Sequence, residues 1–457
     1  MTEQRPRTAS AVAAATPADR DRWADTLRVG SLLVVVLGHW LMVAITPDGQ
    51  ITNALTLIPA LQPVTWVLQV MPLFFLVGGV AHAHTLQRPI GYAAFVRSRA
   101  ARLMRPTLAF LVVWVILGAV AHLAGWTRGE QGRLIRDALV MVPQLLWFVG
   151  IYLGIAAFAP AMLRLHRRAG LWAVLGLVVA AGLVDLIRFG AGIGLVGNLN
   201  FALVWLALHQ LGFSWRDGRL TTQIAWVLFG GGAVGLIAAV TLGPYPVSMV
   251  GLPGDEISNM APPSFALLCQ GLALIGAAAL LRGTMRRVLE RPRVWRAVVV
   301  AGAFAMTAFL WHLTALLLTI LAARVLGIGL PEVGTASWWW SRPLWFLVLA
   351  VPTALLVALF VRFDAGPKGA RGIPTQQPRW VDPLAVLGVL LTVFGILMVS
   401  IVGVDVLGNR PQFFLVGEVT PAVSFGVLVA GLALLYAARS PESGSGSVAA
   451  AQSGPPR

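Results

Sequence analysis

Long apolar runs dominate the chain and alternate with short polar segments. A helical run of about 20 residues crosses the roughly 30 Å hydrocarbon core of a bilayer. In lipid, backbone polar groups must be satisfied within the segment, so such runs are helices. We therefore predict an all-α polytopic transmembrane bundle of about 12 helices. The expected spans lie near residues 29–46, 64–84, 107–125, 138–160, 170–187, 198–213, 222–242, 262–281, 297–319, 343–361, 383–404 and 412–437.

Composition supports a membrane protein. Hydrophobic residues make up 58% of the 457 positions and charged residues only 11%, whereas soluble proteins carry about 25% charged residues. The single cysteine, Cys269, excludes an intrachain disulfide and a cysteine-based metal site. The formal charge of +16 is compatible with nucleic-acid binding, but the placement of the basic residues favours the lipid bilayer as the partner and no nucleic acid.

The positions of the charged residues were not used to assign the spans, so they provide an independent test of the assignment. The two termini and the even-numbered loops hold 27 basic and nine acidic residues, a net charge of +18. The opposite side holds seven basic and nine acidic residues, a net charge of −2. The positive-inside rule assigns the first side to the cytoplasm. We expect a multi-pass protein of the cytoplasmic (inner) membrane with both termini cytoplasmic.

The spans divide the chain into five parts. The N-terminal segment is polar and lacks the features of a cleavable signal, so we expect the first helix to be retained. The predicted parts are a basic cytoplasmic segment (1–28), a ten-helix membrane core (29–361), a cytoplasmic linker (362–382), two additional transmembrane helices (383–437) and a disordered cytoplasmic tail (438–457).

The first helix carries two polar residues that a bilayer makes costly. Ten residues separate Arg28 from His39, so His39 lies within roughly 20° of the Arg28 azimuth and about 16 Å further along the helix. One helix face then presents a cation at the cytoplasmic mouth and an imidazole near the bilayer midplane. This spacing suits a substrate that is anionic at one end and reactive at the other, such as a coenzyme A thioester. Each residue alone has a simpler explanation: Arg28 as a snorkelling positive-inside residue and His39 as a helix-packing hydrogen bond.

Several motifs resemble the acyltransferase-3 family of integral membrane proteins. The family's first-helix pattern of Arg, ten residues and His, in an Asp-x-x-Arg context, is matched by Asp25, Arg28 and His39. Four further segments resemble family motifs in the same order, and the similarity extends over roughly residues 20–360. These segments are 71–79 (MPLFFLVGG), 99–102 (RAAR, followed by Pro106), 146–153 (LWFVGIYL) and 309–312 (FLWH).

The second of these motifs departs from the family pattern. Gly78 stands where the family has Ser, and Val80 where it has Phe, so any role of that hydroxyl is absent here. The last two helices lie outside the resemblance.

The resemblance implies transfer of an acyl group, often acetyl, from cytoplasmic acyl-CoA to a hydroxyl. O-acetylation of a polysaccharide is one such reaction, and the acceptor is a glycan or a secreted small molecule. It makes His39 the catalytic base or acyl-relay residue, with Asp25 in support, and assigns acyl-CoA binding to Arg28, Arg99 and Arg102. His312, about 22 Å along its predicted helix, and Trp311 would face the acceptor. Acyl-CoA is a co-substrate, and no bound cofactor or metal is expected.

A transporter or flippase remains the alternative, with Arg28, His39 and His312 lining a permeation path. Transporters commonly contain two related halves, and residues 29–213 and 222–437 show no such correspondence. Elsewhere, Asp185 and Arg188 are expected to form a structural ion pair. His209 is expected to be structural, and His82 lies near the cytoplasmic end of its helix.

Overall fold

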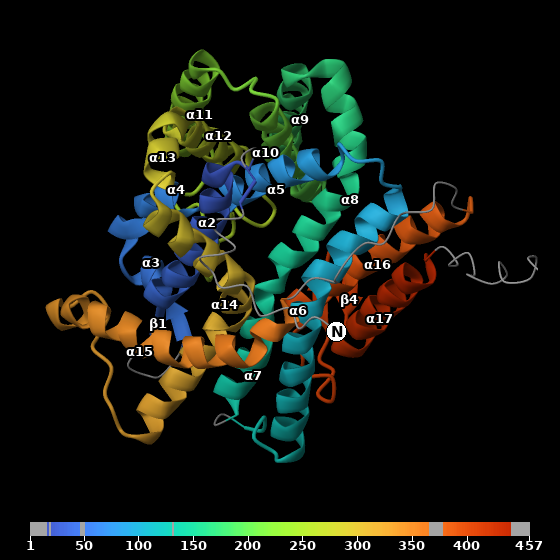
Figure 1. The fold of residues 1–457 in the computed structure, drawn as a ribbon. Helices are drawn as coiled ribbons and strands as arrows, with labels where there is room; N and C mark the ends of the chain where they lie inside the picture. The colour runs from blue at the N-terminus through green and yellow to red at the C-terminus, as the bar shows by residue number, and fades with distance from the viewer. Residues whose placement is uncertain (1–15, 18–19, 46–50, 130–131, 365–377, 440–457) are drawn as a thin grey trace, which may run out of the picture.

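The computed structural model describes residues 16–17, 20–45, 51–129, 132–364 and 378–439, and these form an almost entirely helical bundle (Figure 1). Ten helical segments are long and apolar enough to cross a membrane, and a bent pair brings the number to as many as 11. Each of the twelve expected spans contains a helix. The all-α polytopic fold is confirmed.

The helices and 3₁₀ turns follow one another along the chain. Their bounds are α2 (Arg22–Met42), α3 (Ala54–Leu57), α4 (Thr65–Leu68), α5 (Met71–Thr85), α6 (Tyr92–Leu123), α7 (Arg133–Gln144), α8 (Leu146–Ala169), α9 (Leu171–Gly190), α10 (Asn200–Arg216), α11 (Thr222–Leu242), α12 (Phe265–Leu280), α13 (Arg282–Leu289), α14 (Pro292–Val325), α15 (Ala336–Phe360), α16 (Val381–Val402) and α17 (Pro421–Ala437), with 3₁₀ turns η1 (Pro59–Val64), η2 (Gly194–Leu199) and η3 (Val361–Phe363). The pair α12 and α13 is bent by 54°.

Two short hairpins replace the expected ends of helices. The first span was expected to reach residue 46, but α2 ends at Met42 and strand β1 (Val43–Ile45) pairs antiparallel with β2 (Ile51–Asn53). The twelfth was expected to begin at residue 412, where β3 (Gln412–Phe414) instead pairs with β4 (Gly417–Val419). β-Branched and aromatic residues suit strands as well as apolar helices, so hydropathy alone does not separate them.

Helix α6 begins well before its expected start. The basic segment between Arg88 and Arg105 was interpreted as a loop, but helix begins at Tyr92 and continues through Pro106. Ala, Arg and Leu are good helix formers, and arginines at a membrane surface extend their heads into water. Four arginines of this segment are therefore displayed on a rigid helix.

The core lies where α5, α8 and α10 meet. Helices α5 and α10 approach closely at two glycines: a Cβ at Gly79 would lie 2.9 Å from the Gly212 Cα. Small residues of this kind let membrane helices pack backbone to backbone. Beside this contact, Phe75 stacks on Trp205 with ring centroids 4.4 Å apart.

The remaining helices form pairs around this core. Helix α14 packs against α2 and α15, α11 packs against α12, and α16 packs against both α17 and α8. Figure 1 shows α16 and α17 (orange to red) side by side along α6. Most of the expected linker, the expected tail and the first fifteen residues lie outside the described residues.

Candidate active site

The candidate site lies between α2 and α14, whose ends on the predicted cytoplasmic side are tied to their surroundings. Asp21 caps α2 by accepting from the Ala24 N–H at 3.0 Å, and its other oxygen accepts from Arg282 Nη2 at 2.7 Å and Trp215 Nε1 at 2.8 Å. Arg22 donates to the Leu289 carbonyl at 2.9 Å. These contacts fix the direction in which α2 presents its polar residues.

His39 meets His312 between the two helices. His39 Nδ1 lies 3.0 Å from His312 Nε2, and the ring centroids are 5.0 Å apart. His312 is fully buried, whereas His39 is partly exposed. Two residues that the sequence analysis assigned to different sides of the reaction thus form one unit.

The partners of His312 determine where the protons lie. His312 Nδ1 is 2.6 Å from the Phe309 carbonyl, which only accepts, so Nδ1 carries the hydrogen. Neutral His312 then accepts at Nε2, and His39 donates from Nδ1. This assignment follows from the hydrogen-bond network. It leaves His39 Nε2 with a free lone pair.

Tryptophans brace the pair. Trp40 Nε1 donates to the His312 carbonyl at 3.4 Å, and Trp345 Nε1 donates to the Trp40 carbonyl at 3.1 Å. Trp311 points elsewhere: it is buried and stacks on Phe360 with centroids 4.0 Å apart. Its ring therefore packs α14 against the end of α15.

Arg28 lies on the same side of α2 as His39. A Cβ at Gly302 of α14 would lie 3.7 Å from Arg28 Nη2, so both Arg28 and His39 contact α14. The predicted shared helix face is therefore observed. Arg28 Nη2 is also 3.7 Å from Asp25 Oδ1, and its side chain remains 42% exposed. Because α2 ends three residues after His39, the imidazole lies closer to the far end of the helix than the expected midplane position.

The other predicted arginines act electrostatically on the same residue as Arg28, and sequence reasoning missed this residue. Arg28, Arg99 and Arg102 all act electrostatically on the hydroxyl of Tyr152 in α8. Arg99 Nη2 donates to Thr85 Oγ1 at 2.6 Å, and its guanidinium lies over the Phe95 ring. The three arginines come from α2 and α6, and the packing of α2 against α5 and of α6 against α8 brings them to the same part of the bundle.

Tyr152 also explains the departure at Gly78. A Cβ at Gly78 would lie 2.9 Å from Tyr152 Cε2 and 3.1 Å from its hydroxyl oxygen. The phenol fills the space that a larger residue at position 78 requires. The tyrosine in the segment 146–153 was the available signal, but nothing in the sequence placed it opposite α5.

A family model described as an acyltransferase domain matches residues 21–363, three quarters of the chain. The chain belongs to the acyltransferase-3 family. Comparison with curated proteins and with solved structures gave no match. Membership shows a membrane acyltransferase, and the expected resemblance is confirmed. Helices α16 and α17 follow the part of the chain that the acyltransferase model covers.

This acyltransferase contains a second histidine pair, in the half of the bundle near Arg99. His82 Nδ1 lies 2.9 Å from His209 Nε2, and both rings are buried. His82 lies three residues after Gly79 on α5, and His209 lies three residues before Gly212 on α10. The close approach of the two helices at these glycines therefore brings the rings together. The pairing was not predicted, because the two histidines are 127 positions apart.

The expected ion pair of Asp185 with Arg188 is wrong. Asp185 instead accepts from the Tyr245 hydroxyl at 3.0 Å, Asn200 Nδ2 at 2.9 Å and the Phe265 N–H at 2.7 Å. The Arg188 guanidinium lies over the Phe189 ring. Three hydrogen bonds satisfy the buried carboxylate, so this site joins α9, α10 and the loop before α12. Among the described residues, no three His, Cys, Asp or Glu side chains gather as metal ligands would.

Proposed function

We propose that this protein transfers an acyl group, acetyl in the simplest case, from cytoplasmic acyl-CoA to a hydroxyl of a carbohydrate or secreted metabolite. The observation that carries the proposal is the hydrogen-bonded chain from His39 through His312 to the Phe309 carbonyl. It leaves a basic nitrogen, His39 Nε2, on a partly exposed imidazole. A neutral imidazole with one ring nitrogen free can take a proton from a hydroxyl and so act as a general base.

In the proposed reaction, His39 Nε2 takes the proton of the acceptor hydroxyl while the oxygen of that hydroxyl attacks the thioester carbonyl carbon. The carbon–sulfur bond then breaks, the acceptor keeps the acyl group, and the proton passes to the departing CoA thiolate. While His39 carries the proton, its Nδ1–H donates to His312 Nε2 and so stabilises the imidazolium. His312 therefore orients and supports the base, as the third member of a triad does.

The arginines supply the binding of the donor. Arg28, Arg99 and Arg102 all lie close enough to Tyr152 to act on it electrostatically, and a guanidinium binds phosphate oxygens through two parallel hydrogen bonds. Arg28 and His39 are about 16 Å apart along one helix face. The extended pantetheine arm of CoA suits a site with its anion-binding and reactive groups separated in this way.

The test uses the full chain reconstituted in lipid vesicles, with radiolabelled acetyl-CoA outside and candidate sugars as acceptors. Release of CoA and labelling of the acceptor are measured together for wild type, His39→Ala and His84→Ala. His84 is a matched control, because it lies at the end of α5 and is not part of either histidine pair. We expect His39→Ala to lose nearly all transfer while its thermal stability and that of the control remain close to wild type.

Two results contradict the proposal. Normal turnover by His39→Ala removes this residue from the mechanism. Movement of a labelled solute across the vesicle without CoA release supports the transporter instead.

A further inference from the structure

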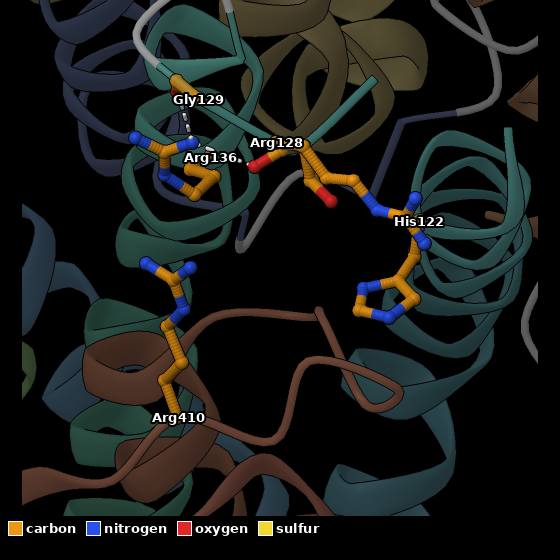
Figure 2. Close-up of a pocket in the computed structure, with 6 residues that line it drawn as sticks. His122, Arg128, Gly129, Arg136 and Arg410 are labelled. Carbon is orange, nitrogen blue, oxygen red and sulfur yellow. Dashed lines mark hydrogen bonds between the residues drawn. The ribbon is translucent and has the colours of Figure 1, made fainter. Parts of the chain in front are cut away.

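An open pocket of about 560 Å³ lies where α6 ends and α7 begins, at the predicted outer end of the bundle (Figure 2). Its lining is strongly basic and comprises His122, Thr127, Arg128, Gly129, Arg136 and Arg410. Only seven of the 34 basic residues were assigned to this side of the membrane from the sequence, and three of them line this one pocket.

In the described part of the chain, the guanidinium groups of this pocket have no acidic partner. Among the described residues, neither Arg128 nor Arg410 has a carboxylate within 4 Å, and Arg136 donates to the carbonyls of Thr127 and Gly129 at 2.6 and 2.9 Å. Asp405 lies 3.5 Å from His122 Nδ1 and also accepts from the Gly408 N–H. Figure 2 shows Arg410 reaching toward Arg136 from the opposite wall. Several cations in one concave site attract an anion.

Two parts of the chain build the pocket. The α6–α7 connection belongs to the acyltransferase domain, whereas Arg410 comes from the connection between α16 and α17, beyond the matched residues. The two parts are hydrogen-bonded to each other: the Val404 N–H donates to the Leu139 carbonyl at 3.0 Å, and Gly403 has a positive φ of 80° where it passes α7. The two additional helices therefore hold one wall of the pocket in place.

The surroundings of the pocket indicate what kind of molecule carries the anion. Large apolar residues flank the lining residues in sequence and are strongly exposed: Leu123 by 78%, Trp126 by 59% and Phe413 by 68%. Tryptophan at the end of a transmembrane helix is typical of the interface between hydrocarbon and head groups. A soluble anion makes no use of such a rim, whereas acyl chains cover it.

We propose that this pocket binds the phosphate of an anionic membrane lipid, with Arg128 and Arg410 donating to the phosphate oxygens and the apolar rim contacting the chains. The ligand is a phospholipid, whose phosphate suits the basic lining and whose chains suit the exposed apolar residues beside it. The additional helices α16 and α17 thereby acquire a role, the completion of a lipid site. This role is independent of the proposed acyl transfer.

The test titrates the detergent-solubilised full chain with phosphatidylglycerol and counts bound lipids by native mass spectrometry. Diacylglycerol, which shares the chains and lacks the phosphate, is the lipid control. We expect the double variant Arg128→Gln/Arg410→Gln to bind phosphatidylglycerol roughly tenfold more weakly or worse, as the loss of two charged hydrogen bonds implies. Both residues are exposed, so folding does not depend on them.

Arg133→Gln is the matched control variant, because Arg133 is exposed at the start of α7, pairs with Asp137 and does not line the pocket. It should bind phosphatidylglycerol like wild type, and diacylglycerol should bind weakly to all three proteins. Equal weakening by Arg133→Gln, or equal binding of both lipids, overturns the proposal. Inorganic phosphate that binds wild type as tightly as the lipid makes the ligand a free anion and overturns the lipid assignment. If the double variant binds phosphatidylglycerol like wild type while wild type still transfers the acyl group, this inference alone is disproved.

Discussion

The imidazole of His39 is hydrogen-bonded to the imidazole of His312 at 3.0 Å, although 273 positions separate them. The contact places a buried histidine directly behind a partly exposed one, with a backbone carbonyl fixing the orientation of the buried ring. A histidine that only packs two helices together needs no fixed order of donors and acceptors. The chain has a defined direction, from a free lone pair inward to a carbonyl that accepts.

Arg28→Lys tests the binding role of the guanidinium. Lysine keeps the positive charge but lacks the planar guanidinium group that binds two phosphate oxygens. We therefore expect KM for acyl-CoA to rise about tenfold with little change in kcat. Steady-state kinetics of the purified protein measures both. The control is Arg286→Lys, an exposed arginine in an ion pair with Glu290 on α13. Equal KM values for wild type and Arg28→Lys return Arg28 to the simpler role of a snorkelling cation.

Gly78→Ser restores the residue that the family carries at this position, and we expect it to be harmful here. The new Cβ would lie 2.9 Å from Tyr152 Cε2, so the phenol must move away from the arginine cluster. Overpacking of this kind typically destabilises by about 1–3 kcal/mol. Thermal unfolding in detergent checks the loss.

Gly230→Ser is the matched control for this change, since a Cβ at Gly230 has no neighbour within 4 Å. Tyr152→Leu should relieve the clash and recover part of the stability of Gly78→Ser. If Gly78→Ser unfolds at the same temperature as wild type, Tyr152 does not determine the residue at position 78.

The carboxyl group of Asp364 is expected to make the stability of the protein fall as the pH rises. The carboxylate follows η3 and accepts from the Thr307 N–H at 3.2 Å and the Thr307 hydroxyl at 2.6 Å, and burial raises its pKa. The folded state therefore holds this proton more tightly than the unfolded state. The contribution of Asp364 to stability falls as the pH rises from the ordinary aspartate pKa of about 3.9 through the raised value.

Asp364→Asn keeps an acceptor for Thr307 and removes the titration. Its unfolding temperature relative to wild type should increase as the pH rises through that window and then level off. Asp137→Asn, at an exposed position on α7, is the control. A difference between Asp364→Asn and wild type that shrinks with rising pH contradicts the assigned direction.

The sequence was sufficient to place a helix within each expected span, because the bilayer demands uninterrupted apolar runs of defined length. Arg28 and His39 were placed on one face because both belong to one helix, whose geometry is fixed. Where the local pattern is ambiguous, as at Val43–Ile45 and Gln412–Phe414, strands appeared where helix was expected.

Contacts between helices could not be predicted in the same way. The pairing of His39 with His312, and of His82 with His209, depends on which helices pack together and at what rotation. The position of Tyr152 against Gly78 has the same origin. A single sequence contains the residues of such a site without the packing that assembles it.

The central claim is that His39 and His312 act as one catalytic unit, and a double-mutant cycle on acyl transfer tests it most directly. The turnover numbers of His39→Ala, His312→Ala and the double variant are compared with wild type, with thermal unfolding to verify folding. Because His312 acts only through His39, the account predicts a substantial loss for His312→Ala and a double variant no slower than His39→Ala. Full activity in His312→Ala, or losses that multiply in the double variant, would contradict it.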